Sequence, residues 1–315
     1  MAKLEFLIQS SKKLYEISEL VTEVSYMDKL NDGCSKLEFS FINDDLVIEN
    51  GNPVRFKYNG VNIFSGIVFK HGYKKDNEIT VTAYDQLRYC KAKDEIVVIK
   101  DTATTLTKRM CTYFGLRVGT LTDAKYVLAT GVQDGKTWLD IIYDGISETL
   151  MNTGKKYCLR DEFGAVALRD LNDLKLNLIL GDESLCYDFD YTKSIDDDFY
   201  NRVKIYVKGE KGKPGQIIVE DSDSSVKKYG LLQYFESVDK DTNISQAKAK
   251  AKALLKLYNQ EVESLNLDCL GDTSIRAGSS FYVYIKDIKI NKQLFVKSVS
   301  HKFLPIHTMS LEVAI

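Results

Sequence analysis

The sequence predicts a mainly β protein in which an α+β domain is inserted between two β-domains. Three observations predict this arrangement. Side chains alternate at period two in the outer thirds, helical patterns mark the middle third, and a short motif near the N-terminus recurs near the C-terminus. The expected domains are residues 1–90, 91–190 and 191–315, the last with an embedded helix. A chain of 315 residues has the length of two or three domains.

The first domain is expected to be a small, twisted antiparallel sheet or barrel. Polar and apolar residues alternate in the runs Lys36–Phe41, Val54–Tyr58 and Ile79–Tyr84. Such alternation is typical of strands that bury one face. Asn59 and Gly60 follow the second run, and both residue types tolerate the positive φ of a tight turn. We therefore expect a β-hairpin at this position.

The middle domain is expected to contain two helices. The first covers Thr102–Phe114, with Asp101 or Thr102 as its N-cap and Gly115 as its stop. The second covers about Thr137–Asn152 and repeats apolar residues on one face. Trp138, the single tryptophan, lies in this helix, which argues against a sugar-binding platform of exposed tryptophans.

Strand patterns return between Tyr157 and Leu180, interrupted by a turn at Glu162–Gly164. They predominate again after Tyr191. One helix is expected there, with Asn243 as its N-cap and Gln246 at the capping-box position. The glycine- and lysine-rich segment 208–215 is expected to be the tip of a hairpin, either a mobile surface loop or an assembly contact.

A weak internal repeat supports two related β-domains. His71 is followed by the strand that begins at Ile79, and His301 is followed by the strand that begins at Met309. The two pairs have the same spacing, and the flanking residues align at one fixed offset. Repetition of this kind indicates one structural unit used twice.

Composition excludes several classes of protein. The 43 basic and 45 acidic residues give a formal charge of −2, without the basic stripe of a nucleic-acid-binding protein. No signal peptide and no apolar run of membrane-spanning length is evident, so we expect synthesis in the cytoplasm and no membrane insertion. The six cysteines form no C-x-x-C pair, which favours buried reduced thiols; they are Cys34, Cys90, Cys111, Cys158, Cys186 and Cys269.

Motifs for catalysis are weak. The segment 131–137, GVQDGKT, has three residues between its first glycine and Gly-Lys-Thr, where a phosphate-binding loop has four. His301 and His307 can approach each other across a hairpin, but no third metal ligand has a matching spacing. The acidic cluster 196–198 is interpreted as a solvated turn, because a calcium loop spaces its ligands. We predict no catalytic, cofactor-binding or metal-binding residue and no cofactor.

Several segments carry a more specific signal. Taken in order, they resemble the XkdQ/YqbQ family of tail proteins from PBSX-type defective prophages and related contractile tails, and they extend over nearly the whole chain. The segments are Phe64–Val68 with Val81–Tyr89, Phe199–Val203, Tyr229–Gln233, Asp268–Asp272 with Arg276–Gly278, and His307–Leu311.

This resemblance implies a non-enzymatic baseplate hub. In such hubs, two tube-like β-barrel domains flank an inserted domain, and a trimer joins the six-fold tail tube to the three-fold spike. Three chains with two similar barrels each can imitate a six-fold ring. The implied partners are further copies of the chain, the tail tube protein, the spike protein and the tape-measure protein, with no specific recognition of nucleic acid.

The particle implied by the resemblance is a phage, a defective prophage or a tailocin, and the sequence does not choose among them. The chain would be made in the cytoplasm of the bacterial host and then become part of the tail baseplate. The edges of both β-domains are the expected interfaces between subunits. The alternative function is a tail-associated cell-wall hydrolase, in which a pair of carboxylates cleaves the glycan.

Overall fold

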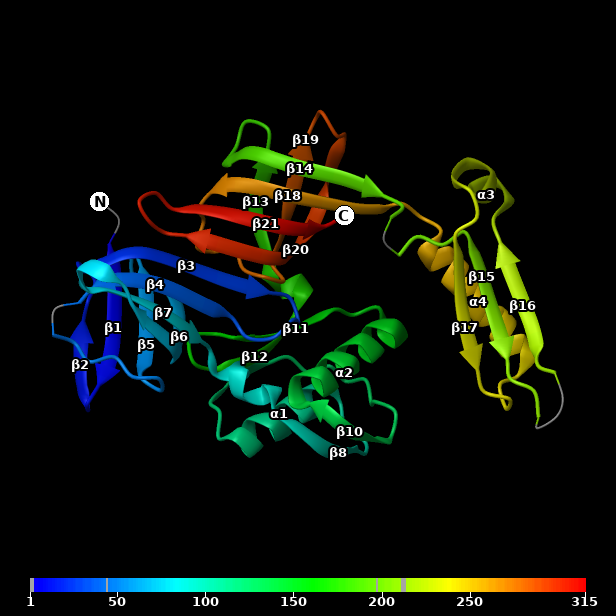
Figure 1. The fold of residues 1–315 in the computed structure, drawn as a ribbon, viewed down its shortest axis with the longest axis horizontal. Helices are drawn as coiled ribbons and strands as arrows, with labels where there is room; N and C mark the ends of the chain where they lie inside the picture. Colours follow the sequence, from blue (N-terminus) through cyan, green and yellow to red (C-terminus); the bar gives the residue numbers. More distant parts are fainter. Residues whose placement is uncertain (1–2, 44, 197, 211–213) are drawn as a thin grey trace. The chain divides into compact units, whose positions relative to one another are not determined.

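The computed structural model describes residues 3–43, 45–196, 198–210 and 214–315. The chain forms two compact units, one of residues 1–189 with 266–315 and one of residues 190–265. Strands β14 and β18 carry the chain out of the larger unit and back into it (Figure 1).

The larger unit contains a 13-stranded sheet. Its main path has the order β14-β18-β21-β20-β3-β4-β7-β6-β5-β1-β2, and β13 and β19 branch from β20. The strands of the N-terminal part are β1 Leu4–Ser10, β2 Lys13–Glu16, β3 Val21–Lys29, β4 Lys36–Ile42, β5 Pro53–Tyr58, β6 Val61–Tyr73 and β7 Glu78–Tyr84. The others are β13 Lys175–Gly181, β14 Cys186–Ser194, β18 Val262–Leu270, β19 Ser280–Ile285, β20 Ile290–Lys302 and β21 Thr308–Ala314.

Two sets of five strands in this sheet follow the same order. The first repeat has the order β3-β4-β7-β6-β5, and the second has the order β14-β18-β21-β20-β19. The equivalent strands β5 and β19 each have 6 residues, and the equivalent strands β6 and β20 each have 13. The two repeats are joined because β20 also pairs with β3.

The expected hairpin after β5 is confirmed, since Asn59 and Gly60 both have positive φ. The N-terminal strands bury a core rich in phenylalanine, in which Phe6 stacks on Phe56 and Phe303 from the end of β20 joins the cluster. The strand pairings of the described residues form open sheets, so the closed barrels that the resemblance implied are not confirmed.

The segment between the two repeats has its own core and two small sheets. Its elements are η2 Gln86–Lys91, β8 Lys93–Val98, α1 Ala103–Phe114, β9 Val118–Leu121, β10 Gly131–Thr137, α2 Trp138–Thr153, β11 Tyr157–Asp161, β12 Val166–Asp170 and η3 Leu171–Leu174, and a further short helix, η1 Lys75–Asn77, lies before β7. Both predicted helices are confirmed. Thr102 and Thr137 cap them in capping boxes, and Gly115 ends the first in the left-handed conformation.

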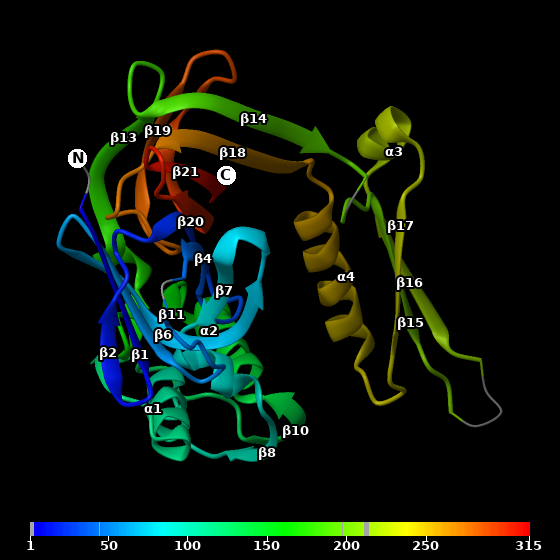
Figure 2. The same ribbon diagram turned by 60° about the vertical axis from the view of Figure 1, so that its left-hand side comes forward.

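The smaller unit is a three-stranded sheet with a helix on one face (Figure 2). Its elements are β15 Arg202–Val207, β16 Gln216–Asp221, α3 Asp223–Tyr229, β17 Gln233–Val238 and α4 Ile244–Tyr258. The predicted cap of α4 is confirmed, because the Asn243 side chain accepts a hydrogen bond from Ser245 N–H. Ala247 and Ala251 are fully buried, since small side chains let α4 approach the sheet closely. Part of the predicted hairpin tip, 211–213, lies outside the described residues.

Candidate assembly surface

One face of the joined sheet is polar across both repeats. Core side chains and polar side chains alternate along each strand, as in β4, where Leu37 and Phe39 are buried and Glu38 is exposed. We call this face the polar face. The residues that line its two grooves include Glu23, Ser25, Met27, Lys29, Glu38, Ser40, Thr80, Thr82, Asn266, Ser298, Ser300, Lys302, Ser310 and Glu312.

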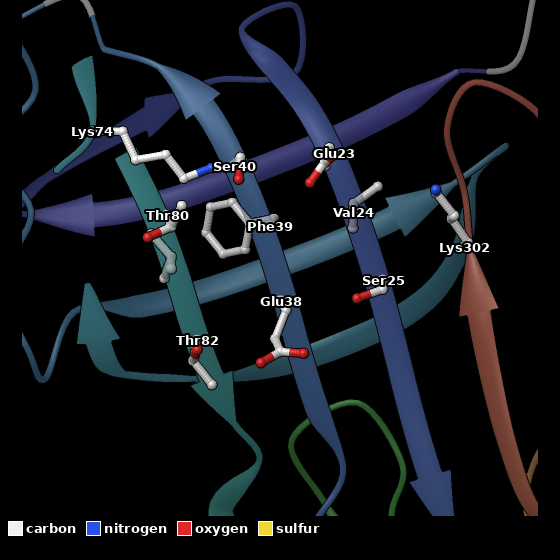
Figure 3. Close-up of a pocket in the computed structure, with 11 residues that line it drawn as sticks. Glu23, Val24, Ser25, Glu38, Phe39, Ser40, Lys74, Thr80, Thr82 and Lys302 are labelled. Atoms are coloured by element: carbon white, nitrogen blue, oxygen red, sulfur yellow. The ribbon is translucent and has the colours of Figure 1, made fainter. Parts of the chain in front are cut away.

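The polar face is shallow and carries both signs of charge. The groove over β3, β4 and β7 has a volume of about 430 Å³, and the groove at the junction of β3, β20 and β21 has about 220 Å³. Figure 3 shows Glu38 and Thr82 standing on the first groove, with Lys302 at its margin. A surface of hydroxyl groups and mixed charges offers no strong attraction to either an apolar chain or a polyanion.

The joint between the repeats is an antiparallel pairing of β20 with β3. His301 lies opposite Tyr26 and Ser300 lies opposite Met27. The pairing continues at one end, where Phe303 N–H donates to Val24 O at 3.0 Å. The second repeat therefore extends the sheet of the first through main-chain hydrogen bonds, which require no particular side chains.

A buried ion pair reinforces this joint. Arg276, in the loop before β19, donates from Nε to Asp28 Oδ2 on β3 at 2.9 Å. Its Nη1 donates to the main-chain oxygen of Asp161 on β11 at 2.8 Å. Asp28 is only 4% exposed, so neither charge is well solvated. One guanidinium thus connects the first repeat, the middle segment and the second repeat.

A second buried carboxylate lies where the first repeat meets the middle segment. Asp85 Oδ2 accepts hydrogen bonds from Ser35 N at 2.7 Å and Ser35 Oγ at 2.6 Å, and Oδ1 accepts one from Leu87 N. Burial, with a further contribution from the Asp161 carboxylate, raises the pKa of Asp85 to about 7. These groups are enclosed and fully engaged in local structure, which indicates a structural role.

The predicted histidine pair exists, but it lacks a third ligand. His301 Nδ1 and His307 Nε2 are 3.0 Å apart, and His301 Nε2 contacts the main-chain oxygen of Ile275 at 2.9 Å. No group of three His, Cys, Asp or Glu side chains suited to a metal occurs in the part of the chain that the structure describes. His71 lies elsewhere, with its Nδ1 2.9 Å from Asn50 Oδ1.

The remaining motifs form ordinary structure. The GVQDGKT segment is strand β10, which pairs with β8, and Thr137 caps α2. The acidic cluster is only partly covered, since residue 197 lies outside the described residues.

All six cysteines are free thiols, and burial raises the pKa of Cys90 and Cys158 to about 12. Among the helices described, none is both long and apolar enough to span a bilayer.

Sequence reasoning missed the polar residues at the joint. Asp28 and Asp161 look like ordinary surface carboxylates in the sequence, and 248 positions separate Asp28 from Arg276. The one available signal was indirect: Asp85 and Arg276 both lie in segments that carry the family resemblance.

The chain belongs to the YQBQ-like family, whose sequence model matches residues 24–314. It is 28% identical over 272 residues to YqbQ of Bacillus subtilis (strain 168), with 84% of this chain and 82% of that protein covered. It is 27% identical over 270 residues to the phage-like element PBSX protein XkdQ of the same organism, with the same coverage. The family inferred from the sequence is thus confirmed.

The fold is also that of a solved tail protein. The crystal structure of the 43 kDa tail protein of prophage MuSo2 from Shewanella oneidensis matches with a TM-score of 0.71 and 12% identity. The match covers 98% of each chain. At this identity, the similarity concerns the arrangement of the elements.

Proposed function

We propose that this member of the YQBQ-like family is a structural hub in the baseplate of a phage-like contractile tail. In this proposal a trimer joins the six-fold tail tube to the three-fold spike, and each subunit contributes two tube-like β-domains. The names of XkdQ and of the Shewanella protein, a phage-like element and a prophage tail, support a place in a tail.

The observation that carries the proposal is the pair of five-stranded repeats, with one strand order, joined side by side through β3 and β20. Three chains with two such repeats each present six similar surfaces to a six-fold partner. The same trimer presents three identical surfaces to a three-fold partner. Duplication within the chain therefore suits a protein that connects the two symmetries.

In the assembled trimer, the polar face lines a central channel. Its hydroxyl groups and its mixture of Glu and Lys side chains suit a passage for the tape-measure protein, and for DNA if the particle is a phage. The chain is made in the host cytoplasm and becomes part of the particle. The three predicted domains, 1–90, 91–190 and 191–315, remain our functional division of the chain.

Light scattering on the purified protein, alone and mixed with the spike protein of the same particle, tests the hub. We expect a complex with three copies of each chain. A chain that stays monomeric with and without the spike contradicts the proposal. We also propose that the role is structural, so the protein alone should not clear peptidoglycan in a zymogram. Clearing would favour the hydrolase.

A further inference from the structure

We propose that the unpaired edge of β6 in one copy of the chain pairs with the outer edge of β14 in a second copy. The pairing of β20 with β3 inside the chain is the template, because it shows how the equivalent strands would pair between two copies. This inference rests on the trimeric ring proposed above and specifies which edges close it. In a ring of three chains, joints within chains and joints between chains would then alternate.

Strand β6 is equivalent to β20 down to its irregularities. Gly51 N–H donates to Val68 O at 2.8 Å and Val68 N–H donates to Asn52 O at 2.9 Å. Val296 of β20 makes the same two bonds, from Gly278 N–H at 2.9 Å and to Ser279 O at 2.8 Å. Directly after Val68, the register of β6 against β7 shifts. Directly after Val296, the register of β20 against β21 shifts in the same way.

This equivalence locates the edge of β6 that corresponds to the joint. Counting from the two valines, Lys70–Lys74 of the first repeat correspond to Ser298–Lys302 of the second. Ser298–Lys302 pair with β21 on one side and with β3 on the other. Residues Lys70–Tyr73 pair with β7 on one side. On the other side, no strand among the described residues pairs with them.

Strand β14 is the counterpart of β3. Both have 9 residues and lie beside the equivalent strands β18 and β4. Burial alternates in the same phase in both strands, because the fourth and sixth residues are more buried than the fifth and seventh, so that Tyr26 corresponds to Tyr191. In the described residues β14 is an end strand, with β18 as its one neighbour, whereas β3 has two. An unpaired strand edge readily accepts another strand.

The template also predicts the register and the charges. In the joint, Lys302 lies opposite Ser25. The equivalent residues across the new interface are Lys74 of one copy and Asp190 of the next, which carry opposite charges. Lys70 in β6 and Lys74 directly after it are basic, and Lys74 also pairs with Glu78 at 3.2 Å. Strand β14 carries Asp188 and Asp190, and its one lysine, Lys193, pairs with Glu263 at 2.7 Å. The two edges are therefore complementary in main-chain pairing and in charge.

Cysteine cross-linking in assembled particles tests the interface. Lys74 and Asp190 are both exposed, so the double variant Lys74→Cys with Asp190→Cys should fold normally. Their counterparts Lys302 and Ser25 alternate with residue pairs that exchange main-chain hydrogen bonds, so the two side chains lie close enough for a disulfide. Mild oxidation by a soluble disulfide such as oxidised glutathione transfers two electrons and two protons from the two thiols to the reagent, which leaves as two molecules of reduced glutathione while the S–S bond between the copies forms.

We expect cross-linked trimers of the double variant on non-reducing gels, and monomers for either single variant. The pair Lys70→Cys with Asp190→Cys is the matched control, because the template separates these residues along the strand. Trimers by mass that fail to cross-link, or that cross-link equally through Lys70→Cys, would overturn the inference and leave the hub intact. Particles in which the chain is not trimeric would overturn the hub itself.

Discussion

The two repeats share a strand order but differ in what separates their first two strands. In the first repeat, the short segment 30–35 connects β3 to β4. In the second, the chain leaves β14, forms the compact unit 190–265 and returns in β18. The ends of adjacent antiparallel strands lie close together, so a whole folded unit can replace a short turn there without disturbing the sheet.

The repeats also differ in the polar groups that they bury. The joint encloses Asp28 of the first repeat with Arg276 of the second. The second repeat further encloses His301, whereas the corresponding residue of the first is Tyr73, which is 66% exposed. Equivalent backbone positions thus carry different side chains: His301 lies at the joint and is buried, whereas Tyr73 lies at an edge left unpaired in the described residues and is exposed.

The largest effect should come from breaking the joint. Arg276→Met leaves the Asp28 carboxylate buried without its partner, and we expect the free energy of unfolding to fall by about 3–5 kcal/mol in urea titrations. The matched control is Lys297→Met, because its pair with Glu312 at 3.4 Å is exposed and should contribute about 0–1 kcal/mol. Equal losses in the two variants would show that the buried pair has no special role.

A second test concerns a position where the repeats carry residues of opposite size. Gly66 of β6 corresponds to Leu294 of β20. A Cβ at Gly66 would lie 2.3 Å from the main-chain oxygen of Tyr84, so Gly66→Ala should cost about 2–3 kcal/mol of unfolding free energy. Gly131→Ala, where a Cβ meets nothing within 4 Å, is the control and should be nearly neutral. If Gly66→Ala leaves the free energy of unfolding unchanged, strands β6 and β7 move apart to make room for the methyl group.

The third test uses pH. Burial, with the neighbouring His301, lowers the pKa of His307 to about 4, from an ordinary value of 6.5. Burial also lowers the pKa of His301. At these histidines the unfolded chain therefore binds protons first, so their contribution to stability should fall as the pH decreases from 6.5 toward 4. The raised pKa of Asp85 contributes with the opposite sign over this range, and a substitution at His307 leaves that contribution in place.

His307→Phe, which keeps a ring against Phe303, should reduce this loss of stability, as measured by urea unfolding at pH 7 and pH 5. If the wild type and His307→Phe lose equal stability on acidification, His307 is not responsible for the acid sensitivity.

The smallest effect concerns the unit that distinguishes the second repeat from the first. Asn243→Ala removes the N-cap of α4 and should cost this unit about 1 kcal/mol. Hydrogen exchange should speed up in α4 while amides of β4 and β7 keep their protection. Asn243→Ser, which retains a capping oxygen, is the control. Faster exchange in β4 as well would mean that the two units unfold together.

Local features of the fold could be read from the sequence. Thr102 and Asn243 cap helices where predicted, and Asn59–Gly60 forms the predicted hairpin turn. The second helix begins at Trp138, so that Thr137, predicted as its first residue, is its cap. Such features depend on a few neighbouring residues, whose conformational preferences act regardless of what surrounds them. The repeat was also detectable, although His71 and His301 are not equivalent: His71 corresponds to Val299, two positions away.

By itself, the sequence therefore determined helices α1, α2 and α4, the alternating strands and the family, whereas helix α3 was not predicted. Only the tertiary structure decided that β3 and β20 share one sheet, that Arg276 joins Asp28 to Asp161, and that residues 190–265 form a separate unit. The physical reason is that strand pairing and buried charges join residues far apart in the chain. Their energies depend on mutual geometry and exclusion of water, which no local pattern records.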